Sequence, residues 1–117
     1  RDWSVTGVQT CALPICLEPR VNSEDAEALA LAFKALCHGV RVQMLDLISQ
    51  GGGEICGCDI ERHFDLTQPT ISHHLKVLRD AGLITSEARG VWMHHRVNQA
   101  RVDALRDWLL ALHPLPR

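Results

Sequence analysis

The sequence predicts a mainly α-helical fold of about five helices with one small β-hairpin, arranged as a winged helix-turn-helix. Three observations lead to this prediction. Apolar residues recur at helical spacing over most of the 117 residues. A short helix and a well-capped helix follow one another between Ile60 and Gly82, and two β-prone stretches then flank Gly90. Two consecutive helices followed by a β-hairpin, the wing, make up a winged helix-turn-helix.

Composition indicates one ordinary globular domain. The chain is 46% hydrophobic and 22% charged, and its apolar runs are too short to span a membrane, so we expect a cytoplasmic protein. The formal net charge is only -2, but residues 18–66 hold nine acidic and four basic residues, whereas residues 67–101 hold two and five. Positive potential is therefore concentrated in the second half, as a nucleic-acid partner requires.

The first residues differ from the rest. Residues 5–15 can be back-translated without a mismatch to a widely used sequencing-adapter oligonucleotide, so we expect residues 1–15 to be a non-native leader without an evolved role for Cys11. A genuine disordered leader is the alternative. The remaining chain is expected to divide into a disordered remnant, one folded domain and a tail, at residues 16–22, 23–112 and 113–117.

Two helices are expected to open the domain. Ser23 can cap the first helix, and acidic residues in its first turn suit the positive end of the helix dipole. The second helix is expected over residues 40–50 and ends at three consecutive glycines, which disfavour further helix. The apolar stripe of the first helix is Leu29, Ala32, Phe33 and Leu36.

A helix-turn-helix follows. Ile60 and Phe64 are four residues apart and indicate a short helix, after which Thr67 can cap a helix of about four turns that ends at Gly82. Pro69 lies in the first turn, where its missing N–H costs nothing. At helical spacing one side of this second helix is apolar and consists of Ile71, His74, Leu75, Leu78 and Ala81.

The opposite side of that helix is short, polar and mildly basic. Such side chains can contact base edges and phosphates in a DNA major groove. An ordinary amphipathic surface helix has the same periodicity, and the surrounding motif favours DNA binding. The predicted DNA-contacting residues on this side are Thr67, Gln68, Thr70, Ser72, His73, Lys76 and Arg79.

Two strands are expected next, over residues 83–88 and 91–97, with Arg89 and Gly90 as the turn. Arg89 at the tip is a further predicted DNA contact, to a phosphate or the minor groove. Adjacent strand residues face opposite sides, so His94 and His95 are poorly placed to share a metal and are interpreted as structural.

The last helix, residues 99–112, carries an apolar seam suited to pairing between subunits, at Val102, Leu105, Leu109 and Leu112.

Residues 66–84, LTQPTISHHLKVLRDAGLI, resemble the recognition helix of the ArsR/SmtB family of winged-helix, metal-responsive repressors, and the likeness extends over roughly residues 24–112. The resemblance implies a homodimer on palindromic double-stranded operator DNA, with Leu29 and Phe33 joining the apolar seam of the last helix in the dimer interface. The chain departs from the family at His38 and Gly39, where relatives have Asp-Pro. On the last helix only Asp103 and His113 remain of a zinc site, so zinc sensing is not expected there.

Cys56 and Cys58 begin the short helix. Closely spaced thiols in a cytosolic protein indicate metal binding or redox activity more than a structural bridge, with two small core residues as the alternative. The surrounding EICGCDI resembles the family's ELCxCDL site, through which arsenite, antimonite, or in some members cadmium and lead, release the repressor from DNA. Soft ions prefer thiolate sulfur, and a helix N-terminus favours the thiolate.

Trivalent arsenic prefers three sulfurs, and some relatives place the third where this chain has Glu61. Cys37, at the junction of the first two helices, is the candidate third ligand, with a buried structural thiol as the competing interpretation. A third ligand could also come from the natural N-terminus, which we expect the leader to replace, or from the partner subunit. Two thiols with a solvent ligand would also bind the inducer.

The sequence therefore predicts a DNA-binding transcriptional repressor that is not an enzyme, needs no obligatory cofactor, and takes As(III) or Sb(III), or else Cd(II) or Pb(II), as inducer. One alternative is a thiol-redox-responsive regulator that forms a sulfenic acid or a disulfide. A thiol-dependent enzyme is the other, and it would need a relay such as Cys-x-x-Cys in a βαβ unit, which the sequence lacks.

Overall fold

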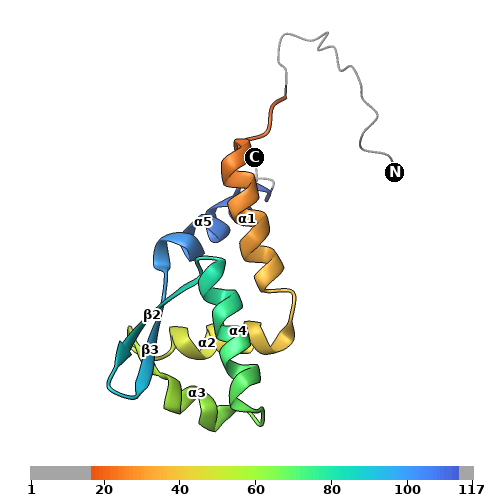
Figure 1. Ribbon diagram of the computed structural model, residues 1–117. Coiled ribbons are helices and arrows are strands. Elements are labelled where there is room, and N and C mark those ends of the chain that lie inside the picture. The colour runs from red at the N-terminus through yellow and green to blue at the C-terminus, as the bar shows by residue number, and fades with distance from the viewer. Residues whose placement is uncertain (1–16, 114–117) are drawn as a thin grey trace.

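The computed structural model describes residues 17–113, which form five α-helices and a three-stranded antiparallel sheet (Figure 1). The predicted winged helix-turn-helix is confirmed, and the predicted leader, residues 1–15, lies outside the described residues. In chain order the elements are α1 Ser23–Ala35, α2 Gly39–Ser49, β1 Ile55–Cys56, α3 Gly57–His63, α4 Gln68–Asp80, β2 Ile84–Arg89, β3 Trp92–Val97 and α5 Gln99–Ala111.

The caps of α1 and α2 differ from the prediction. Asn22, not Ser23, caps α1, because its side-chain Oδ1 accepts from the Asp25 N–H at 2.8 Å. The imidazole of His38 caps α2 by accepting from the Val40 N–H at 3.3 Å, so the turn that departs from the family still satisfies a helix N-terminus.

Among residues 17–113 no single helix has the length and apolarity to cross a membrane, while α1 and α2, bent by 101°, pass that test only as a pair.

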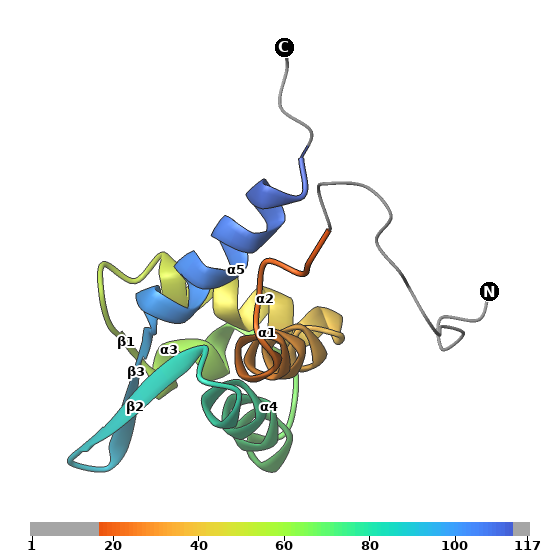
Figure 2. The ribbon, with the colours of Figure 1, turned by 90° about the horizontal axis from the view of Figure 1, so that it is seen from above.

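Helix α4 agrees with its prediction. Thr67 caps it, with Oγ1 accepting from the Thr70 N–H at 3.4 Å, and Gly82 follows the C-cap residue with φ of +79°, a conformation that favours glycine. The five residues predicted to face inward are all buried. In Figure 2, α1 and α4 are seen nearly end-on beside each other, with α5 and the hairpin extending in different directions.

The sheet has one strand more than predicted. Its order is β1-β3-β2, and the short β1 pairs with β3 so that Cys56 lies opposite His94. The predicted two-stranded wing is thus a three-stranded sheet. Arg89 pairs with Trp92, so the turn is Gly90 and Val91, one residue later than predicted, with Gly90 at φ of +63°.

The predicted dimer-interface residues divide into two groups. Leu29 and Leu105 are buried in the core of their own chain, and their predicted place at a subunit interface stays a prediction. Phe33 is half-buried and its ring lies 5.8 Å from that of Trp108, while Val102 also packs against the core. Only Leu109 and Leu112 remain about half exposed, since α5 continues beyond the body of the domain (Figure 2).

Candidate DNA interface and thiol site

The outward side of α4 is fully accessible. Burial of its apolar side against the core fixes the helix with its polar side turned to solvent. Every predicted DNA-contacting residue is exposed, on α4, at its cap or at the wing tip. These residues are Thr67, Gln68, Thr70, Ser72, His73, Lys76, Arg79 and Arg89.

A hollow of about 280 Å³ separates the outward side of α4 from the wing. Gln68, Ser72 and Arg79 line it from α4, and residues 91–93 line it from the wing. Amide, hydroxyl and guanidinium groups thus converge there, which are the donor and acceptor types that contact nucleic-acid bases and phosphates.

The cations of this surface differ in their partners. The Lys76 ammonium lies 2.7 Å from the Asp80 carboxylate, and this hydrogen bond holds the pKa of Asp80 below its usual value. Arg89 lies between two carboxylates, at 3.1 Å from Glu87 and 2.9 Å from Glu54, and the hydrogen bond to Glu87, followed by the charge of Glu54, raises the pKa of its guanidinium. Within residues 17–113, Arg79 makes no ion pair, which leaves its guanidinium for another anion.

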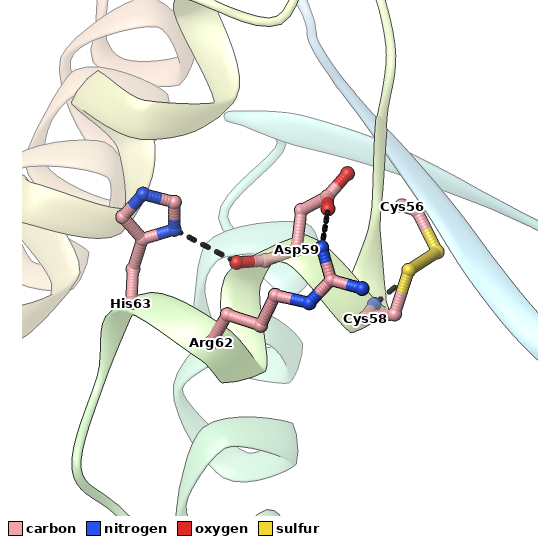
Figure 3. Close-up of polar contacts among 5 residues, drawn as sticks. All are labelled: Cys56, Cys58, Asp59, Arg62 and His63. Atoms are coloured by element: carbon pink, nitrogen blue, oxygen red, sulfur yellow. Dashed lines mark hydrogen bonds and ion pairs between the residues drawn. A yellow bond between two sulfur atoms is a disulfide. The ribbon is translucent and has the colours of Figure 1, made fainter.

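The thiol pair lies where β1 ends and α3 begins. Cys56 is the N-cap residue of α3, and its Sγ accepts from the Cys58 N–H at 3.2 Å. The two sulfurs are joined as a disulfide, and both residues are half-buried (Figure 3). Arg62 reaches back along α3 and pairs with Asp59 at 3.4 Å, and His63, at the other end of the helix, lies with its Nδ1 2.9 Å from the Asp59 carbonyl oxygen (Figure 3).

The predicted third ligand, Cys37, lies on another element of the fold. It is exposed at the end of α1, and its thiol turns back along that helix to the Phe33 carbonyl oxygen at 3.4 Å. Across residues 17–113 no three His, Cys, Asp or Glu side chains are grouped as a metal ion would need. Helix α1 packs against α4, and the assignment of Cys37 as third ligand stays a prediction.

Two histidines are buried beneath the interface. His74 of α4 lies beside Arg41, whose Nη1 is 3.3 Å from its Nδ1, and burial followed by the charges of His38 and Arg41 lowers its pKa. His95 of β3 is 2.7 Å from the Ser86 hydroxyl, and burial lowers its pKa as well. The sequence led to a structural interpretation of His94 and His95 without a prediction of which one is buried.

These shifts predict an acid-sensitive fold. A histidine with a lowered folded-state pKa binds its proton more readily in the unfolded chain, so stability is fully present above the unfolded pKa of about 6.5 and is lost as the pH falls below it. We expect the free energy of unfolding, measured by urea denaturation, to decrease from about pH 7 to pH 5.5. The decrease should shrink in His95→Gln and persist in His63→Gln, since His63 is exposed. An unchanged pH dependence in His95→Gln would contradict this assignment.

Comparison with known proteins agrees with this architecture. The family model described as "Bacterial regulatory protein, arsR family" matches residues 38–86. The arsenical resistance operon repressor of Bacillus subtilis (strain 168) is 40% identical over 73 residues, covering 62% of this chain and 69% of the relative. The repressor of the same name from Staphylococcus aureus is 40% identical over 75 residues, covering 64% and 70%.

A solved structure shows the same fold. The homodimeric winged helix-turn-helix DNA-binding domain from Mycobacterium bovis, a possible ArsR-family regulator, has a TM-score of 0.63 at 21% identity and covers 88% of this chain and 100% of that one. The resemblance noted in the sequence is thereby confirmed. The chain belongs to the arsR family of bacterial regulatory proteins.

Proposed function

We propose that this protein is a homodimeric transcriptional repressor of an arsenical resistance operon, which binds palindromic operator DNA and releases it when arsenite or antimonite binds Cys56 and Cys58. The observation that carries the proposal is the position of the thiol pair. Cys56 caps α3, the first helix of the helix-turn-helix, and also pairs with wing strand β3. A ligand on these sulfurs therefore acts on both parts of the DNA-binding surface, in the cytoplasm where such an operator lies.

The DNA-binding half rests on α4 and the wing. An α-helix fits the major groove, and the exposed hydroxyl, amide, imidazole and cationic groups of α4 match the chemistry of base edges and phosphates. The relatives named arsenical resistance operon repressors support the same role. They also favour a regulator over the thiol-dependent enzyme, for which the fold offers no βαβ unit among its described elements.

The sensing half needs reduced cysteines. Two thiols condense with arsenite, As(OH)₃, by forming two As–S bonds and releasing two water molecules, and one hydroxyl remains on arsenic. The start of α3 favours the thiolates because the positive end of the helix dipole lies there. Since Cys37 lies elsewhere, this chain supplies two sulfurs, and Cd(II) or Pb(II) would meet the same soft donors. No obligatory cofactor enters the proposal.

Release follows from linkage. If ligand binding distorts the short helix α3 and disfavours the DNA-binding geometry, DNA must weaken ligand binding by the same factor. A coupling free energy of about 3 kcal/mol corresponds to about 150-fold, enough for a transcriptional switch. The element that both ligands would bias is the β1–α3 segment.

The dimer is proposed to form through α1 and α5. An apolar groove of about 440 Å³ runs between these helices, with Leu29 and Trp108 among its lining residues. Leu110 is 62% exposed, and Leu109 and the C-cap residue Leu112 are about half exposed. A second copy would cover these leucines, as two-fold interfaces are self-complementary.

An operator-release titration tests the function. Fluorescence anisotropy follows a DNA pool selected by the full chain, kept reduced with a phosphine, while arsenite, antimonite, cadmium and zinc are added. We expect arsenite to release the wild type and Cys37→Ser alike, because Cys37 is not grouped with the thiol pair, and to leave Cys56→Ser/Cys58→Ser bound. If no thiophile releases the DNA, the proposal that Cys56 and Cys58 sense an inducer is wrong. If Cys37→Ser no longer responds to arsenite, Cys37 is a ligand.

A second candidate function is redox sensing, favoured by the disulfide between Cys56 and Cys58. Peroxide would oxidise the dithiol to the disulfide and be reduced to two water molecules. The same titration, with the phosphine removed and hydrogen peroxide added in metal-free buffer, separates the candidates. Release by peroxide but not by arsenite would select the redox regulator, and release by arsenite alone would reject it.

A further inference from the structure

Glu54 connects the thiol segment to both wing strands by charge. It lies immediately before β1, and its Oε1 is 2.9 Å from Nη1 of Arg89 and 3.9 Å from Nη2 of Arg96. The Glu54 side chain is 23% exposed and that of Arg89 is 48% exposed, so the carboxylate is the more enclosed partner. This ion pair spans 35 residues of sequence and brings β1 to the wing tip.

The backbone makes the same connection. Cys56 pairs with His94 of β3, and His94 pairs in turn with Glu87 of β2, so a row of directly opposite residues crosses the sheet. Figure 2 shows β1, β3 and β2 together on one side of the helices. Glu54 lies two residues before Cys56, just outside β1, and lines the same hollow as His94 and Glu87 of this row. A displacement of Cys56 therefore moves Glu54 relative to the wing arginines.

Arg89 is held by carboxylates at the position predicted to contact DNA. It is the last residue of β2, next to the Gly90 turn, and is bound by Glu54 and Glu87. A phosphate that binds Nη1 or Nη2 of this guanidinium competes with the carboxylates for the same charge. Ion pairs this exposed are weak, so the exchange is easy and its balance is sensitive to small displacements of either partner.

We propose that Glu54 is a positioning residue that competes with operator phosphate for Arg89, and that a ligand on Cys56 and Cys58 strengthens this competition by fixing the thiol segment. The inference rests on the proposed function, since it describes how ligand binding at that site reaches the wing. Without ligand, the short strand β1 can move, so that Glu54 separates from Arg89 and Arg89 binds the DNA phosphate. With ligand, Glu54 stays on Arg89, and the wing no longer binds the phosphate.

Glu87 supplies a matched control. It also binds Arg89, at 3.1 Å, but it belongs to β2 and not to the thiol segment. Glu54→Gln and Glu87→Gln remove the same charge near the same guanidinium. Both are expected to tighten operator binding in the absence of ligand by about twofold to fivefold. Only Glu54→Gln should alter the response to ligand.

The test measures operator affinity by anisotropy with and without arsenite for the wild type and both variants. We expect the ratio of the two affinities to fall about twofold to fivefold in Glu54→Gln and to stay at the wild-type value in Glu87→Gln. In an Arg89→Ala background, Glu54→Gln should no longer change the ratio. A purely structural role would lower the melting temperature without changing this ratio.

The outcomes are distinguishable. If arsenite releases the wild type and Glu54→Gln by equal factors, the role of Glu54 is wrong while the proposed function stands. If the affinity ratio changes equally in Glu54→Gln and Glu87→Gln, the effect is one of charge alone and the role of Glu54 is again wrong. A wild type that arsenite does not release would overturn both. If Glu54→Gln does not fold, Glu54→Asp keeps the charge but shortens the reach to Arg89, and the same fall in the ratio is expected.

Discussion

Replacing Leu78 by alanine is expected to lower the free energy of unfolding by about 2–5 kcal/mol. Leu78 lies on the inward side of α4 with 0% of its surface exposed, among the largest fully buried side chains of the domain. The change removes buried apolar area and leaves a cavity that a close-packed core fills only in part. Small domains have about 5–15 kcal/mol of stability in total, so this one substitution removes a large share.

Urea denaturation followed by circular dichroism measures this effect, at one fixed protein concentration because dimerisation adds to apparent stability. Leu17→Ala is the matched control: it deletes the same atoms from a side chain that is 93% exposed and should stay within about 0.5 kcal/mol of the wild type. If the free energy of unfolding falls by similar amounts in both variants, the buried position of Leu78 does not contribute specifically to stability.

Helix α4 could be predicted from sequence because its information is local. A capping threonine, a proline in the first turn, an apolar period and a terminal glycine all lie within one short segment, and each agrees with the others. The apolar side predicted from that period is the side the structure buries. The exposure of the opposite side then follows from geometry alone, and its contacts with DNA stay a prediction.

Strand β1 could not be predicted in the same way. Two residues, Ile55 and Cys56, are too few to show strand alternation, and their extended conformation depends on pairing with β3 some forty positions later. The ion pair of Glu54 with Arg89 is hidden for the same reason. The sequence indicates that Cys56 starts a helix but gives no sign that it also belongs to the wing sheet.

The cap of α1 and the burial along α5 could not be read from the sequence for similar reasons. Asn22 and Ser23 are both good capping residues, and only the backbone conformation decides between them. A helix seam such as that of α5 indicates burial but not its partner, so Leu105 of the chain's own core and the exposed Leu109 look alike in sequence.

Replacing Arg79 by alanine is expected to weaken operator binding by about tenfold to a hundredfold for each base or phosphate that its guanidinium binds. Arg79 lies on the outward side of α4, lines the hollow beside the wing, and makes no ion pair within residues 17–113. Its guanidinium therefore gives up no carboxylate when it binds DNA, unlike Lys76 and Arg89. A dimer carries two copies of Arg79, so the total decrease in affinity can exceed that for a single arginine.

Arg106→Ala separates a specific interaction from a general loss of charge. Arg106 is a 59% exposed arginine of α5 that pairs with Asp103 and Asp107, so its removal changes the net charge equally, away from α4. Anisotropy titrations at several salt concentrations should show a large decrease in affinity for Arg79→Ala and little for Arg106→Ala. If Arg79 binds a phosphate, the slope of log affinity against log salt falls by about one per copy, whereas binding to a base relaxes sequence preference instead. Equal, small decreases in both variants would mean that the outward side of α4 does not bind the operator through Arg79, and that the paired cations carry the interface.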